Sequence, residues 1–175
     1  NPVFGATKNP YDQTCSAGGS SGGAAAALAC GMVSVADGSD MMGSLRNPAA
    51  WNNVYGMRPT FGLVPSEPNG DTFLHHLATN GPMARNPSDL AALLDTMSGN
   101  DPRQPMSFDQ GTTLPALKVN ISGASVGWLG DWGGAYAMDA GVLDTSRWAL
   151  AATNWQAENY STTETYDVGD IRFYS

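Results

Sequence analysis

Two short clusters of glycine and serine are the places where this chain could do chemistry. The first is SAGGSSGG, residues 16–23, and the second is GSDMMGS, residues 38–44. Glycines let backbone N–H groups converge on one point because no Cβ blocks the approach. A helix that begins directly after such a loop adds the positive end of its dipole. Ser20, Ser21 and the two amides that follow them therefore indicate a corner that could stabilise an anion.

The second cluster ends in Ser44, which follows a glycine and could act as a nucleophile. A Ser-His-Asp triad is one alternative for this serine, since His75 and His76 are present, but the chain lacks a G-x-S-x-G turn. Adjacent histidines on a strand face opposite sides, which favours a structural or substrate-lining role. A phosphate-binding loop is the weaker alternative for the first cluster, because no lysine follows its glycines.

The elements that must position these clusters alternate between strands and helices. Small apolar residues and a following glycine predict a helix after the first cluster, and the i, i+3, i+4, i+7 leucine pattern predicts a later one. This alternation indicates a layered α/β fold. The expected helices are Gly23–Met32, Pro48–Val54, Pro87–Met97 and Asp139–Glu158, and the expected strands are Val33–Ala36 and Ala124–Trp132. We also expect a loop over Asp37–Ser44, an extended segment over 56–66, and a tail of β-type composition.

Composition narrows the class of protein. The chain has 175 residues, enough for one domain with a core. Sixteen acidic against eight basic residues give a net charge of −8, which argues against nucleic-acid and anionic-membrane partners. Cys15 and Cys30 are expected to be reduced thiols, and together with the lack of a signal peptide they favour a cytoplasmic protein. Nothing in the spacing predicts a metal site or a cofactor.

Several ordered motifs together resemble the amidase signature family. They are GGSSGGAAAALACGM, GSDMMGSLRNPAA, YGMRPTFGLVP and GPMARNPSDLAALLDTMSG. The family carries a Gly-Gly-Ser-Ser-Gly-Gly loop, an alanine-rich helix, Gly-Thr-Asp-x-Gly-Gly-Ser-x-Arg-x-Pro-Ala, Gly-x-Lys-Pro-Thr-x-Gly and Gly-Pro-x-Ala-Arg-x-x-x-Asp in that order. The match spans about Asn9 to Gly99 and extends more loosely through VGWLGDWGG. It implies a layered mixed β-sheet flanked by helices, with residues 1–175 as one domain and a fragment of a longer chain.

The resemblance also implies roles for individual residues. The family hydrolyses carboxamide C–N bonds with a Ser–cis-Ser–Lys triad and releases an acid and ammonia or an amine. By motif position, Ser44 resembles the nucleophile, Ser20 the bridging serine after a cis peptide bond, and Ser21 its support. The remaining carried-over residues are the amides of Met41, Met42, Gly43 and Ser44 as an oxyanion hole, and Asp40 with Arg46 as a buried pair that anchors the loop.

The chain departs from the family pattern at the base and beside the nucleophile. The family's lysine lies several dozen residues upstream of the first serine, and neither Lys8 nor Lys118, the only lysines here, matches its motif. We therefore expect an upstream segment or a second chain to supply the lysine. Met42 stands where the family has glycine and could narrow the oxyanion hole or line the acyl pocket. Arg58 replaces the lysine of Lys-Pro-Thr, which is a mild change.

Three functions stay open on this evidence. The first is hydrolysis of a small-molecule amide, the second is a glutamine-amidohydrolase subunit that passes ammonia to a partner, and the third is a non-catalytic scaffold. A homodimer is compatible with all three. The substrate is not predicted; candidates for an aromatic pocket, each equally suited to the core, are Trp51, Phe61, Phe73, His75, His76 and Trp132.

Overall fold

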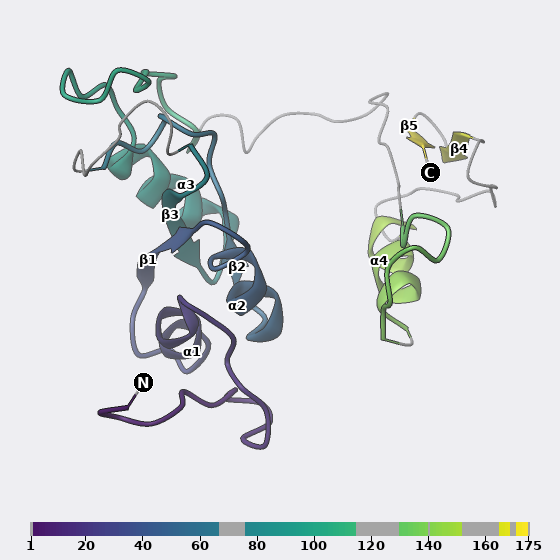
Figure 1. The fold of residues 1–175 in the computed structure, drawn as a ribbon. Helices are drawn as coiled ribbons and strands as arrows, with labels where there is room; N and C mark the ends of the chain where they lie inside the picture. Colours follow the sequence, from purple (N-terminus) through teal and green to yellow (C-terminus); the bar gives the residue numbers. More distant parts are fainter. Residues whose placement is uncertain are drawn as a thin grey trace. The chain divides into compact units, whose positions relative to one another are not determined.

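The computed structural model describes residues 2–66, 76–114, 130–139, 141–151, 165–168 and 171–174. The chain forms two compact units, Asn1–Lys118 and Val119–Ser175. In Figure 1 the first unit carries α1 to α3 with β1 to β3, and the second carries α4 with β4 and β5. Every residue to which a catalytic or supporting role was assigned above belongs to the first unit.

The sheet of the first unit has the strand order β1-β3-β2. Its strands are β1 (Val35–Asp40), β2 (Tyr55–Gly56) and β3 (Thr79–Ala84), and β3 pairs antiparallel with both neighbours. In the β1–β3 ladder Val35 faces Ala84 at one end and Asp40 faces Thr79 at the other. Five of the six residues of β3 are buried, as expected for a central strand. The α/β class is confirmed, and the described strands of this sheet pair antiparallel.

Three helices pack on this sheet, namely α1 (Gly22–Ala29), α2 (Arg46–Trp51) and α3 (Pro87–Met97). Helix α3 contacts β3, α1 contacts β1, and α2 contacts β2 (Figure 1). Leu45 and Met83 are fully buried in the main cluster between helices and sheet, and Leu63 and Leu94 in a second one beside α3. The core therefore consists of small and medium apolar side chains, and the loop leaving β1 contributes Leu45 directly to it.

Several predicted boundaries are corrected by the structure. Helix α3 has the predicted bounds, but α1 ends at Ala29 because Gly31 adopts φ +68°, a helix-ending conformation. Strand β1 begins two residues later than predicted and continues to Asp40, so half of the predicted second loop is strand. Helix α2 begins at Arg46, before Pro48, and ends at Trp51. Strand β3 was not predicted, because its sequence TNGPMA contains Gly and Pro.

The second unit contains α4 (Val142–Ala151) and a hairpin of β4 (Thr165–Val168) and β5 (Ile171–Tyr174). Helix α4 lies within the predicted helix 139–158, whose residues 152–158 are outside the described ones. The strands agree with the β-type composition of the tail. Most of the strand predicted over Ala124–Trp132 is also outside the described residues, and the part that is described, 130–132, is a turn.

Candidate active site around Ser44

Asp40 organises the loop that carries Ser44. It is the last residue of β1, its side chain is wholly buried, and its carboxylate accepts hydrogen bonds from three amides of the loop. The distances are 2.7 Å from Gly43 N, 3.2 Å from Leu45 N and 3.3 Å from Arg46 N. The Arg46 side chain adds two more, from Nε at 2.9 Å and Nη2 at 3.0 Å. Because α2 begins at Arg46, the same carboxylate also satisfies amides at the start of that helix.

These contacts determine the charge state of Asp40. The hydrogen bonds from the Arg46 guanidinium hold the pKa of the Asp40 carboxyl well below its usual range. Burial acts in the opposite direction, and the amides of Gly43, Arg46 and Leu45 lower the pKa further. The family resemblance implies a buried pair of Asp40 and Arg46. The Arg46 side chain is 54% exposed, so only the Asp40 carboxylate of this pair is buried. The result is a fixed negative charge directly beneath the loop.

The loop geometry around Ser44 depends on Gly43. Its φ of +105° disfavours any other residue, and a Cβ there would lie 2.7 Å from the side-chain nitrogen of Asn47. The Gly43 N–H points to Asp40, so within this loop the amides of Met41, Met42 and Ser44 remain as candidates for oxyanion contacts. The side chains of Met41 and Met42 are 55% and 84% exposed. An apolar surface thus lies immediately beside the candidate nucleophile.

The first Gly/Ser cluster meets this loop directly. The Ser21 amide donates to the Ser44 carbonyl at 3.2 Å, although the two residues are 23 positions apart in the sequence. The Ser21 hydroxyl also donates to the Ser39 carbonyl on β1 at 3.5 Å. The peptide bond between Gly19 and Ser20 is cis. The two serine loops are therefore neighbours in space.

Gly38 makes this meeting possible. A Cβ on Gly38 would lie 2.5 Å from the Ser21 hydroxyl oxygen and 2.8 Å from Leu45 Cδ2, both too close for real atoms. The side chains of Ser21 and Leu45 therefore share the space above this glycine. In the ladder Gly38 faces Gly81, and Leu45 Cδ1 would be 2.9 Å from a Cβ there. A pair of glycines in adjacent strands thus receives the leucine that follows Ser44.

Two asparagines fasten the segment before Ser20 to helix α2. Asn52 is buried and its side-chain amide donates to the Ala17 carbonyl at 2.8 Å and to the Pro48 carbonyl at 2.7 Å. Asn9 donates to the Trp51 carbonyl at 2.7 Å. Both serine loops therefore adjoin the same short helix, one by leading into it and the other by these hydrogen bonds.

The comparisons with known proteins identify the family. The sequence profile named amidase matches residues 1–159, most of the chain. The chain belongs to the amidase signature family. Among its relatives, a glutamyl-tRNA(Gln) amidotransferase subunit of Sulfurisphaera tokodaii is 42% identical over 128 residues, covering 73% of this chain and 27% of that protein. An acylamidase of Rhodococcus erythropolis is 40% identical over 154 residues, covering 87% of this chain and 32% of that protein.

A solved structure indicates the same family. A bacterial aryl acylamidase of the amidase signature family superposes with a TM-score of 0.66 and 41% sequence identity, over 71% of this chain and 26% of that one. The chain thus spans about a third or less of the length of these amidase relatives. The family and its α/β fold are established for the matched residues.

Of the other predicted residues of this amidase chain, the structure describes Phe61, His76, Trp51 and Trp132. The His76 ring stacks on Phe61 with a centroid distance of 4.7 Å and a tilt of 33°. Trp51 is 57% exposed and packs against the backbone of Gly18. Trp132 belongs to the second unit, where it contacts Tyr136 edge-on at 6.4 Å. Phe73, His75 and Lys118 lie outside the described residues.

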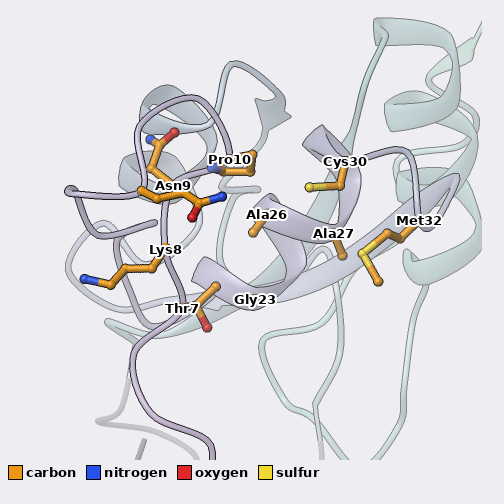
Figure 2. A pocket seen from close by; sticks show the side chains of 10 residues that line it. Thr7, Lys8, Asn9, Pro10, Gly23, Ala26, Ala27, Cys30 and Met32 are labelled. Carbon is orange, nitrogen blue, oxygen red and sulfur yellow. The ribbon is translucent and has the colours of Figure 1, made fainter.

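A separate open pocket of about 350 Å³ lies between the N-terminal segment and α1 (Figure 2). Its lining residues are Thr7, Lys8, Asn9, Pro10, Gln13, Gly23, Ala26, Ala27, Cys30 and Met32, so Ser20 and Ser44 are not among them. The Lys8 side chain extends away from α1 in Figure 2. Across the described ranges, no group of three or more His, Cys, Asp or Glu could hold a metal ion. Within the same ranges, no helix has the length and apolar character needed to cross a membrane.

The sequence prediction missed three residues that build the site. Gly38 and Gly81 were not assigned a role, because the importance of a glycine pair depends on the strand register, which the sequence did not reveal. Arg58 was noted only as a replacement, yet it contacts both the carboxylate and the backbone carbonyl of Asp40. The available signal was its place in the segment 56–66, which was predicted to be extended, but neither β2 nor β3 was predicted.

Proposed function

We propose that the protein containing this chain hydrolyses the C–N bond of a carboxamide, with Ser44 as its nucleophile. The observation that supports this most is the hydrogen bond between the Ser21 amide and the Ser44 carbonyl, which joins the two serine loops. The fixed carboxylate of Asp40 beneath the loop and the cis bond before Ser20 agree with the roles that the family resemblance implies. The free thiols Cys15 and Cys30 suit the cytoplasmic location that we propose.

The proposed reaction passes through an acyl-enzyme. The Ser44 oxygen attacks the carbonyl carbon while its proton passes to the Ser20 hydroxyl, which gives its own proton to a neutral lysine. The amides of Met41, Met42 and Ser44 stabilise the resulting oxyanion. The C–N bond then breaks, and the proton returns through Ser20 to the leaving nitrogen. Water, deprotonated by the same route, cleaves the Ser44 ester and releases the acid.

The lysine of this scheme is proposed to come from an upstream segment or from a second chain. Neither Lys8 nor Lys118 stands in the motif that carries the lysine in the family. Burial must lower the pKa of that lysine so that it is neutral and can accept a proton near neutral pH.

Reaction with a fluorophosphonate probe tests the proposal. In the protein that contains this chain, the probe should label Ser44, and Ser44→Ala should abolish both labelling and amide turnover. Ser20→Ala should lower turnover by a few orders of magnitude, because the proton route is interrupted. Ser39→Ala is the matched control, since Ser39 lies on neighbouring β1 and only its carbonyl contacts Ser21. Labelling that persists in Ser44→Ala contradicts the proposal, and a protein that takes up no probe fits the scaffold alternative.

A glutamine-amidohydrolase subunit is the second candidate function. It is favoured by relatives named as subunits of glutamyl-tRNA(Gln) amidotransferase, at 42% identity in Sulfurisphaera tokodaii and 40% in Alcanivorax borkumensis. Release of ammonia from glutamine, dependent on an added partner protein, would select this candidate. Turnover of simple amides without any partner would select the independent hydrolase. Both candidates use the same Ser44 chemistry, so the probe experiment applies to each.

A further inference from the structure

The guanidinium of Arg58 lies between the ends of two strands. Its Nε donates to the backbone carbonyl of Asp40 at 3.3 Å and lies 3.6 Å from that residue's carboxylate oxygen Oδ1. Its Nη2 donates to the carbonyl of Leu77 at 2.6 Å, two residues before β3 begins. The Arg58 side chain is only one-third exposed, at 33%. One side chain therefore joins the end of β1 to the segment that enters β3.

Arg58 reaches this place because the chain crosses β3 at a glycine. Met57 donates its amide to the Pro82 carbonyl on β3, which continues the pairing of β2 with β3. A Cβ on Gly81 would collide with the Met57 carbonyl oxygen and lie 2.7 Å from Pro59 Cδ. The absence of a side chain at Gly81 thus lets residues 57–59 lie against β3. From there the Arg58 side chain extends to Asp40, on the far side of the central strand.

Asp40 consequently contacts two cations. Arg46, which follows the Ser44 loop, makes two hydrogen bonds to the carboxylate and is half exposed. Arg58 follows β2 in the chain and contacts both the carboxylate and the main chain of Asp40. Because the carboxylate in turn holds the amides of Gly43 and Leu45, the residues on both sides of Ser44, any displacement of Asp40 moves Ser44 with it.

We propose that Arg58 is a positioning residue for Ser44, which fixes the Asp40 carboxylate and thereby the loop that presents the nucleophile. This inference rests on the proposed function of Ser44. A planar guanidinium suits the position, because one group must direct separate N–H donors at the carbonyls of Asp40 and Leu77, whereas an ammonium is a single point charge.

Arg85 provides a matched control for this role. It follows β3 directly and its Nη1 also donates to two backbone carbonyls, of Leu28 at 3.1 Å and of Val33 at 2.5 Å. It lies at the other end of the same ladder, where Val35 faces Ala84, whereas Arg58 lies where Asp40 faces Thr79. Loss of either arginine removes a link between elements, but of the two only Arg58 contacts Asp40.

The experiment compares variants of the protein that contains this chain, at a temperature where all are folded. Arg58→Met should slow fluorophosphonate labelling of Ser44 and lower kcat for a simple aryl amide by ~10- to 100-fold, as expected for a small displacement of a reacting group. KM should change little, since Arg58 is not expected to touch substrate. Arg58→Lys should restore part of the rate because it keeps the charge. Arg85→Met should lose stability without slowing the labelling.

Two outcomes would overturn the inference. One is labelling of Arg58→Met at the wild-type rate, and the other is an equal loss of rate in Arg85→Met. If Arg58→Met does not fold, Arg58→Gln keeps a side-chain donor without the charge and carries the same expectation. Ser44→Ala separates this inference from the proposed function. If Ser44→Ala is still labelled by the probe, the proposed function itself fails. If Ser44→Ala is not labelled and Arg58→Met is labelled at the wild-type rate, only the role of Arg58 is refuted.

Discussion

At the scale of single residues, the Asp40 carboxylate acts as a structural ion. It is wholly buried, yet it accepts three amides and two guanidinium N–H groups within one short segment. A buried charge is costly unless it is paired and hydrogen-bonded, and here both conditions hold. The loop between β1 and α2 is therefore folded around a charge, and Ser44 takes its position from that charge.

The pH dependence of stability should report this carboxylate. The folded-state pKa of Asp40 lies below its unfolded value of about 3.9. Its contribution is therefore fully present above that pH and is lost as the pH falls towards the folded pKa. Asp40→Asn should cost roughly 3 kcal/mol in the free energy of unfolding at neutral pH and flatten the fall in stability below about pH 4. Denaturant titrations at several pH values measure this, and parallel curves for the two proteins would contradict it.

Gly38 should be intolerant of even one methyl group. In Gly38→Ala the new Cβ would lie 2.5 Å from the Ser21 hydroxyl oxygen and 2.8 Å from Leu45 Cδ2, so both side chains must move. We expect a loss of roughly 1–3 kcal/mol and slower labelling of Ser44, because Ser21 and Leu45 adjoin it. Gly23→Ala is the control: nothing lies within 4 Å of a Cβ there, and it sits within helix α1. Equal stability and labelling in Gly38→Ala and wild type would refute this account.

The sequence predicted these residues unevenly. Asp40 and Arg46 were assigned as a pair through the family resemblance, and they form an ion pair at 2.9 Å. Gly38 was not singled out, because a glycine that is needed for a close approach looks like any loop glycine until its neighbours are known. The roles of Ser20 and Ser44 stay predictions, whereas the adjacency of their loops is seen in the structure.

At the scale of elements, local signals decided what could be predicted. Helix α3 was predicted with its observed bounds because it has the i, i+3, i+4, i+7 apolar pattern and is followed by Gly99. Strands β1 and β3 were mispredicted since their sequences, VADGSD and TNGPMA, lack β-branched alternation. Leu45 on one face and helices α1 and α3 cover these strands and stabilise their pairing. The residues that make these contacts are distant in the sequence, so local sequence patterns do not predict them.

The cap of α3 provides a test at this scale. The Asn86 side chain accepts the Asp89 amide at 2.8 Å and donates to the Asp89 carboxylate at 2.7 Å. Asn86→Ala should lower the free energy of unfolding by about 1 kcal/mol, measured by urea denaturation, whereas Asn86→Ser should keep most of the cap. Labelling of Ser44 should stay unchanged, because Asn86 follows β3 at the end of the ladder remote from Asp40. A slower labelling rate would show that this helix and the serine loops are coupled.

At the scale of the whole molecule, the residues with proposed roles lie in one unit, whereas the proposed reaction also needs a lysine as base. The unit Asn1–Lys118 contains Ser20, Ser44 and the carboxylate that holds the loop, and its described lysine is Lys8. In the proposed reaction a lysine must come within hydrogen-bonding reach of Ser20. Whether Lys8 could be that group is a question about its surroundings.

Those surroundings predict that Lys8 is dispensable. Its side chain is exposed, lines the separate pocket beside Ala26 and Cys30, and extends away from α1 (Figure 2). The face of α1 that lines this pocket is not the face that packs on the core, since Ala25 and Leu28 are the helix residues buried in the main cluster. In the protein that contains this chain, Lys8→Met should therefore leave kcat and the rate of Ser44 labelling within about twofold of wild type, as expected of a surface substitution remote from the site. A loss as large as that of Ser20→Ala would instead make Lys8 the base, and the proton route would then have to pass beside the N-terminal end of α1.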